Sequence, residues 1–263
     1  TLLHNPQQGL SIQIGNGNLL SKLLNCKVIY NFRNADLING GQGAPISPIY
    51  HKLILEQFNI ILPSLIINIG GITNLTFWDG KNLLGFDVGP GNNLMDYYTT
   101  LNFNQKYDID GNLASQGNSK KDLVKKFCKH IFFKTSPPKS LERKVLFDNQ
   151  ALMEIYALNH YDCLATLSDL VCETILSSYF YLPEKPKLAV IVGGGAKNKN
   201  LIRNLRKKLN HDVLVGSEVG LNVDYVESEL IGFLAARFLN KIPSTFSSTT
   251  GALKPTILGV EAK

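Results

Sequence analysis

An aspartate stands between an apolar run and a glycine-rich turn in the stretch GFDVGPGNNLMD, residues 85–96. Residues 82–86 have the composition of a strand, and the residues after the turn have helical spacing. Ligands of open α/β sheets bind outside the carboxyl ends of the strands, so Asp87 is a candidate catalytic carboxylate. It could instead accept hydrogen bonds from the backbone of its own turn. This stretch alone leaves both interpretations open.

Glycine clusters follow strand-like runs at three places, NIGGITN (68–74), DVGPGN (87–92) and GGGAKN (193–198). Glycine lets backbone N–H groups approach a phosphate, and a helix that starts after the turn adds its dipole. Each cluster alone could be an ordinary turn, but together they favour an anionic, nucleotide-like ligand. The familiar nucleotide signatures are absent: there is no G-x-x-x-x-G-K-[ST], and Gly15-Asn16-Gly17 lacks the third glycine of G-x-G-x-x-G.

The elements that must position these residues are predicted from hydrophobic periodicity and from turn residues. The expected strands cover residues 10–14, 28–32, 65–68, 72–78, 83–88, 187–192 and 212–215. The expected helices cover residues 19–24, 47–58, 119–132, 159–179, a segment from about 198, and 226–239. The strands of 65–68 and 72–78 form a hairpin around Gly70 and Gly71, and 83–88 extends it to a meander. This order predicts a mixed α/β domain.

Composition places the chain among globular proteins and argues against two classes of partner. Of its 263 residues 44% are hydrophobic and 18% charged, and no apolar run reaches the length of a membrane span. The net charge is +6, but apolar residues interrupt the lysine-rich runs 120–126 and 203–209. Such runs are typical of solvated faces of amphipathic helices. We therefore expect neither nucleic acid nor a membrane as a partner.

The cysteines indicate a reducing compartment. Cys26, Cys128, Cys163 and Cys172 form no C-x-x-C pair and have no ligand-like spacing with histidine. Their neighbours are apolar, so we predict reduced thiols in the core of a cytoplasmic protein.

The combined pattern resembles the anhydro-N-acetylmuramic acid kinase family of the actin/hexokinase/Hsp70-like ATPase superfamily. The matching stretches keep the family's order and reach nearly from end to end: FRNADLINGGQGAPISPIYH (32–51), NIGGITNLTFW (68–78), GFDVGPGNNLMD (85–96), YDIDGNLASQGN (107–118), PPKS (137–140), CLATLSDLVCETI (163–175), VGGGAKNKNLI (192–202), YVESELIGFLAARFLN (225–240) and TGALKPTILG (250–259). The resemblance implies an actin-like ATPase fold of the ribonuclease H-like kind. It also implies a reaction, in which ATP and water open 1,6-anhydro-N-acetylmuramic acid and phosphorylate O6. The product would be N-acetylmuramic acid 6-phosphate, an intermediate of peptidoglycan recycling.

The resemblance also implies roles for particular residues. Asp87 matches the family's catalytic aspartate, the general base for the water that attacks C1. The residues expected to bind ATP are Asn68, Gly70, Gly71, Asn74, Gly193, Gly194, Gly195 and Asn198. The residues expected to bind the sugar are Arg33, Gly41, Gln42, Gly43, Gly89, Gly91, Asn92 and Glu227. Mg²⁺ would be held mostly by phosphates and waters, so no protein metal site is expected.

Two departures from the family are visible. Family members carry a glycine-rich phosphate loop ahead of the region seen here, and Thr1 matches the end of a His-Gly-Gln-Thr stretch. We therefore expect residues 1–32 to be a remnant of the first ATPase domain and 33–263 to be the second domain with a C-terminal segment. Leu141-Glu142-Arg143-Lys144 also stands where the family usually has Thr-Gly-Arg-Glu.

Three hypotheses follow. The chain is a kinase of anhydro-N-acetylmuramic acid that is complete only with its missing segment, and its expected protein partner is either a second copy in a homodimer or a separate N-terminal half. Alternatively, it is another sugar kinase or ATPase of the superfamily. The third hypothesis is an inactive C-terminal remnant that still binds nucleotide or a partner chain.

Overall fold

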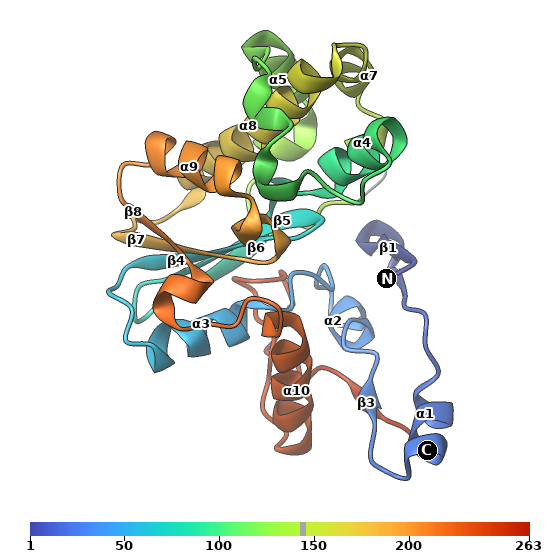
Figure 1. Ribbon diagram of the computed structural model, residues 1–263. Coiled ribbons are helices and arrows are strands. Elements are labelled where there is room, and N and C mark those ends of the chain that lie inside the picture. The colour runs from blue at the N-terminus through green and yellow to red at the C-terminus, as the bar shows by residue number, and fades with distance from the viewer. Residues whose placement is uncertain (143–145) are drawn as a thin grey trace.

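A five-stranded sheet with the order β6-β5-β4-β7-β8 forms the centre of the molecule in the computed structural model, which describes residues 1–142 and 146–263 (Figure 1). Its strands are β4 (Ser64–Ile69), β5 (Ile72–Trp78), β6 (Leu83–Pro90), β7 (Leu188–Val192) and β8 (Asp212–Val215). The β6-β5-β4 meander is antiparallel, whereas β7 and β8 extend the sheet parallel to β4. This is the arrangement that the predicted ribonuclease H-like fold requires, and it confirms that prediction.

Both faces of the sheet are covered by helices, because its central strands are apolar on both sides (Figure 1). Leu65, Ile67 and Ile69 of β4 pack on one face against α8 (His160–Ser178) and α9 (Lys199–Lys208). Ile66 faces the other way and packs with residues of α3 (Pro48–Gln57) and α10 (Val226–Leu239). The sheet is therefore the middle layer of three.

The remaining elements surround this sandwich. The helices are α1 (Gly17–Leu24), α2 (Asn34–Ile38), α4 (Asn93–Phe103), α5 (Lys121–Phe127) and α7 (Gln150–Tyr156). Two small antiparallel ladders join β1 (Leu3–Asn5) to β2 (Leu10–Ile12), and β3 (Ile29–Tyr30) to β9 (Val260–Glu261). The second ladder brings the region near residue 30 beside the end of the chain. The domain boundary that we expected at residue 32 stays a prediction.

Most predicted elements are present, and the differences have local causes. The strand 212–215 and the helix 226–239 have the expected bounds, and Asn198 caps α9 by accepting a hydrogen bond from the Leu201 N–H at 3.0 Å. The strand expected at 28–32 covers only two residues, because Asn31 adopts a left-handed φ of 58°. The strand expected at 83–88 continues to Pro90.

The prediction for the cysteines is only partly correct. Cys163 and Cys172 are buried thiols of α8, as expected, and Cys128 is half-buried. Cys26 is exposed, because the apolar residues before it, Leu23 and Leu24, are themselves exposed. All four are free thiols. None of the described helices is both long and apolar enough to cross a bilayer.

Candidate active site

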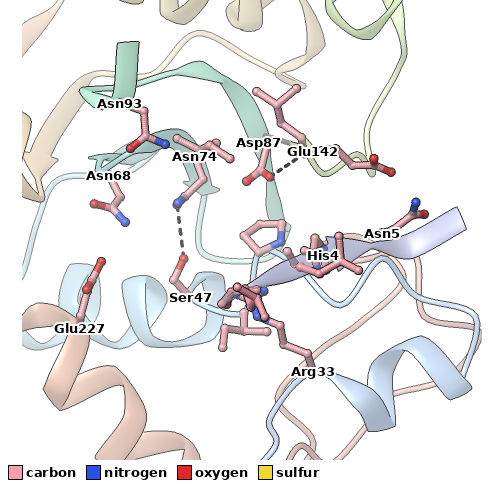
Figure 2. A pocket seen from close by; sticks show the side chains of 18 of the residues that line it. His4, Asn5, Arg33, Ser47, Asn68, Asn74, Asp87, Asn93, Glu142 and Glu227 are labelled. Atoms are coloured by element: carbon pink, nitrogen blue, oxygen red, sulfur yellow. Dashed lines mark hydrogen bonds between the residues drawn. The ribbon is translucent and has the colours of Figure 1, made fainter. Parts of the chain in front are cut away.

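A cavity of about 990 Å³ lies between the central sheet, the β1 strand and α10. Five of the predicted site residues line it: Arg33, Asn68, Asn74, Asp87 and Glu227. Figure 2 shows Asp87 at one end with Glu142, His4 and Arg33, and Asn68 with Glu227 at the other. Segments far apart in the sequence therefore meet at one cavity.

A β-bulge in β6 places Asp87. Asn74 of β5 pairs with Asp87 but its neighbour Thr73 pairs with Gly89, so Val88 is an extra residue in β6. Bulges re-aim side chains and are common beside active sites. Beyond the bulge, Gly89 faces α8, where an added Cβ would lie 2.9 Å from Thr174. The structure thus turns Asp87 to the cavity and packs Gly89 against a helix.

The Asp87 backbone and carboxylate are held from the PPKS segment. The Asp87 N–H donates to the Lys139 carbonyl at 3.0 Å, and the Leu141 N–H donates to Asp87 Oδ2 at 2.8 Å. The side chain is only 7% exposed, and burial raises the pKa of Asp87 from 3.8 to about 6. The Leu141 N–H, Arg33 and Lys139 act against this rise in pKa. A carboxyl group with such a pKa is suited to general-base work near neutral pH.

Lys139 is a buried cation on the far side of Asp87. Its Nζ donates to the Phe132 carbonyl at 3.1 Å and lies 4.6 Å and 4.7 Å from the ring centroids of Phe132 and Tyr181. Burial lowers the pKa of Lys139 to about 8, whereas the Asp87 charge raises it. The aromatic rings partly replace the hydration of the ammonium group.

The loop of Gly41, Gln42 and Gly43 lies behind Arg33. The guanidinium of Arg33 donates from Nη1 to the Gly43 carbonyl at 2.7 Å. Gln42 accepts a hydrogen bond from Ser140 Oγ at 3.2 Å, which connects the loop to the PPKS segment. The loop therefore fixes the Arg33 guanidinium through Gly43 and contacts the PPKS segment, which holds Asp87, through Gln42.

A fully buried carboxylate, Asp36, organises this loop. It accepts hydrogen bonds from the Gly43 N–H at 2.7 Å, from Thr250 Oγ1 at 2.7 Å and from Thr245 Oγ1. An added Cβ at Gly41 would lie 2.1 Å from Asp36 Oδ2, so only glycine fits there. The close approach explains why the loop needs glycine at this position.

The three glycine clusters pack against one another, and Asn68, Asn74 and Asp87 of the first two line the cavity. The Gly91 and Asn92 N–H groups donate to the Gly71 and Gly70 carbonyls at 3.0 Å and 2.8 Å. An added Cβ at Gly91 would lie 2.2 Å from the Gly70 oxygen. The turn between β4 and β5 is thus tied to the turn after β6.

The third cluster, Gly193 to Gly195, packs against the end of β4 at Asn68 and Ile69. An added Cβ at Gly193 would lie 2.3 Å from Asn68 Oδ1, and one at Gly195 would lie 2.4 Å from Ile69 Cγ2. Gly194 is more open, with Asn92 Nδ2 as the nearest atom at 3.3 Å. These glycines allow close packing of loops, and the helices α4 and α9 start directly after the second and third clusters. Two helix N-termini beside converging glycine loops form an arrangement suited to an anion.

Glu227 is placed by the first turn of α10. Two residues further on, Glu229 Oε2 accepts a hydrogen bond of 2.7 Å from Tyr50 Oη, which fastens α10 to α3. Burial and this bond raise the pKa of Tyr50 well above its usual range. The helix is therefore held so that Glu227 faces the cavity opposite Asn68 (Figure 2).

Sequence reasoning missed several residues that line the cavity, among them His4, Ser47, Asn93, Tyr97 and Glu142. Ser47 Oγ donates to Asn74 Oδ1 at 3.3 Å (Figure 2), and no sequence motif links these positions. Spacing on α4 could have indicated the pair of Asn93 and Tyr97, which are four residues apart.

His4 reaches the cavity from the β1 strand. Its Nδ1 forms a hydrogen bond of 3.1 Å with Ser11 Oγ of β2. Burial and the nearby Arg33 charge lower the pKa of His4 to about 4, while the Gln42 carbonyl acts in the opposite direction. The ring is thus neutral at neutral pH.

The stretch Leu141-Glu142-Arg143-Lys144 departs from the family pattern. Two of its residues, Arg143 and Lys144, lie outside the described residues.

The strand order and the site define an α/β protein of the actin-like ATPase class. A family model described as "Anhydro-N-acetylmuramic acid kinase" matches residues 1–263, and the chain belongs to this family. Curated relatives named anhydro-N-acetylmuramic acid kinase agree. One from Rhodopseudomonas palustris (strain BisB18) is 37% identical over 257 residues, covering 97% of this chain and 69% of the relative. One from Pelagibacter ubique (strain HTCC1062) is 37% identical over 274 residues, covering 100% of this chain and 72% of the relative.

Similarity to solved structures is more distant. The activator of the 2-hydroxyisocaproyl-CoA dehydratase from Clostridium difficile has a TM-score of 0.42 and 15% identity, covering 69% of this chain and 64% of that one. MreB 5 of Spiroplasma citri has a TM-score of 0.30 and 14% identity, covering 73% of this chain and 60% of that one.

Proposed function

We propose that the chain is a kinase that uses ATP and water to convert 1,6-anhydro-N-acetylmuramic acid into N-acetylmuramic acid 6-phosphate. The observation that carries the proposal is Asp87, a buried carboxylate turned by a bulge into a cavity, in a chain of this family. The reaction belongs to peptidoglycan recycling and would take place in the cytoplasm, where ATP is available.

Asp87 acts as the general base. Its Oδ2 is bound to the Leu141 N–H, and no hydrogen bond to Oδ1 is made by the described residues. Oδ1 can accept the proton of a water that attacks C1 of the sugar. The bond between C1 and O6 breaks, and O6 takes up the γ-phosphoryl group as ADP leaves. Asp87 then returns its proton to solvent, so the water supplies the new hydroxyl at C1.

The sugar would lie between Asp87 and Arg33, the end of the cavity with the most charged groups. Arg33 offers further N–H donors beyond the one bound to Gly43, and the loop of Gly41 and Gln42 keeps it in place. Glu227 would accept hydrogen bonds from sugar hydroxyls at the opposite wall. These groups orient the sugar, which contributes most of the catalytic advantage in such reactions.

The converging glycine loops fit the phosphates of ATP. Gly70 and Gly194 have the most open backbone of the clusters, and Asn68 and Asn74 line the cavity beside them. The N-terminus of α9, with its cap Asn198, adds a favourable dipole.

Mg²⁺ would accompany the triphosphate. No group of three or more His, Cys, Asp or Glu side chains among residues 1–142 and 146–263 could hold a metal ion. Phosphate oxygens and waters would therefore supply most of its ligands, as is usual for this ion, and its charge would offset that of the phosphates.

The test is ADP release from ATP and Mg²⁺ by the purified chain, with and without 1,6-anhydro-N-acetylmuramic acid, in water enriched in ¹⁸O. The proposal predicts sugar-dependent ADP release and a product whose phosphate-ester oxygen is unlabelled, because that oxygen comes from the anhydro bridge. Release with ordinary hexoses but not with the anhydro sugar would instead identify another sugar kinase. Nucleotide binding without any sugar-dependent release would refute the proposal that this chain is a kinase by itself and would favour the inactive remnant.

A further inference from the structure

Tyr97 lines the cavity but has no role in the chemistry proposed above. It lies on α4 one turn after Asn93, and both side chains line the cavity. Its neighbour Tyr98 faces the core, where it is buried. Tyr97, by contrast, is 46% exposed and lines the cavity.

The Tyr97 ring is held in place by two other rings. Phe147, which also lines the cavity, packs edge-on at 5.6 Å between centroids and an angle of 84°. Tyr156 of α7 stacks at 6.3 Å and 30°. An aromatic side chain has few rotatable bonds, and these contacts restrict it further. Little conformational entropy is therefore left to lose when a ligand covers the exposed surface.

The surroundings of Tyr97 select the kind of ligand. A pyranose has hydroxyl groups that need polar partners and C–H groups that prefer an apolar surface, and the π face of an aromatic ring attracts C–H groups of partial positive charge. Asp87 and Arg33 supply polar groups in the same cavity, and Leu141 adds to its apolar wall. The cluster of Gly193 to Gly195, which is expected to bind ATP, is not among the described residues that line this cavity. The ring is therefore placed for the sugar and not for the base.

We propose that Tyr97 is a stacking platform for the apolar, C–H-bearing side of the bicyclic sugar, and that it determines affinity for the sugar without taking part in the chemistry. This inference rests on the proposed function. A stacking contact is made equally in the ground state and in the transition state, so its loss raises KM and leaves kcat unchanged.

The experiment compares Tyr97→Leu with Tyr97→Phe. The leucine variant removes the ring, and we expect the KM for the anhydro sugar to rise about 3- to 10-fold, with kcat and the KM for ATP unchanged. The phenylalanine variant keeps the ring, and its KM should stay within about twofold of the wild type. Tyr161→Leu is the matched control, because Tyr161 is 41% exposed and packs on Phe103 but is not among the described cavity-lining residues.

Saturation-transfer NMR without nucleotide separates this inference from the proposed function. Irradiation of aromatic protein protons should saturate sugar C–H protons in the wild type and much less in Tyr97→Leu. If the wild type binds the sugar and Tyr97→Leu gives the same KM and the same transfer, the inference is wrong and the kinase proposal stands. If the wild type neither binds nor turns over the sugar, the proposed function is wrong and the inference falls with it. A loss of kcat in Tyr97→Leu at unchanged KM would also overturn the platform role.

Discussion

Replacing the candidate base should stabilise the protein while it abolishes turnover. Asp87→Asn keeps the shape of the side chain and an oxygen that can accept the Leu141 N–H. It removes the charge, which the site makes unfavourable because burial raises the pKa of Asp87 from 3.8 to about 6. The asparagine therefore imitates the neutral form, which the folded protein tolerates better than the charged form when both are compared with the unfolded chain.

The size of the effect follows from proton linkage. A pKa that rises from 3.8 to about 6 on folding corresponds to about 3 kcal/mol in favour of the neutral carboxyl. The folded state binds more protons than the unfolded state in this window, so wild-type stability falls as pH rises from about 4 to about 6. Asp87→Asn does not show this loss. Its advantage in unfolding free energy should be about 3 kcal/mol at pH 7 and should vanish below pH 4.

The assay is urea unfolding of both proteins at several pH values, together with kcat/KM for the anhydro sugar. Wild-type kcat/KM should be half-maximal near pH 6 and about one-tenth of its plateau at pH 5, because only the ionised carboxylate accepts the proton. Asp87→Asn should lose a factor on the order of 10² to 10⁴ in rate at pH 7.

A matched control is Asp96→Asn. Burial also raises the pKa of Asp96 to about 6, but Asp96 is not among the described residues that line the cavity. Its replacement should stabilise the protein, by less because the side chain is only partly buried, and leave turnover intact. An Asp87→Asn protein that is no more stable than the wild type at pH 7 would refute the linkage argument, and one that keeps full turnover would refute the role as base.

Three further predictions concern the scaffold around the site. Asp36→Ala leaves buried donors without an acceptor and should lower the free energy of unfolding by about 3–5 kcal/mol in urea titrations. His51, whose Nδ1 bonds to Thr76 Oγ1 at 2.8 Å, has a pKa lowered to about 3 by burial, so stability should be lost as pH falls from 6.5 towards 3. His51→Asn should make that loss shallower in the same titrations. Gly91→Ala forces a Cβ to 2.2 Å from the Gly70 oxygen and should cost about 1–3 kcal/mol and raise the KM for ATP.

Each of these has an outcome that contradicts it. A change below about 1 kcal/mol in Asp36→Ala would mean that water replaces the carboxylate. An unchanged slope of stability against pH in His51→Asn would assign the acid sensitivity to other groups. Equal stability of Gly91→Ala would mean that the two turns separate without cost.

The meander, and the place of Asp87 at its glycine turn, could be predicted because their signals are local. Apolar runs, glycine pairs and helical spacing identify β4, β5, β6 and α4 without knowledge of their partners. The bulge could not be predicted, because it is a difference in register between two strands and the residues from Asp87 to Gly89 look the same with or without it.

The roles of glycines are hard to separate from sequence alone. Gly89 packs against Thr174 of α8, and Gly41 makes room for Asp36. A glycine needed for packing and a glycine needed for a ligand have the same letter and the same turn neighbours. Whether Gly89, Gly91 and the glycines of 193–195 also touch ligands stays a prediction.

Residues that reach the cavity from distant segments were missed for a different reason. His4 and Tyr97 belong to short elements whose own periodicity says nothing about what they face. Only the ladder of β1 with β2 and the packing of α4 bring them to the cavity. The prediction that Cys26 lies in the core is wrong for the same reason, since periodicity does not show what an element packs against. The apolar residues of α1 stay exposed, because no other described residues pack over them.

The hydrogen bonds of Asp36 have a consequence for the order in which the site forms during folding. Thr245 and Thr250 are separated from Asp36 by 209 and 214 residues. Contacts of such high sequence separation close late, because the entropy of a long loop must be overcome first. On the ribosome, the last strand of the central sheet, β8, is synthesised before residues 244–256. The hydrogen bonds that hold the glycine loop behind Arg33 can therefore be completed only after the C-terminal segment docks, so this part of the candidate site forms after the strands of the sheet have been made.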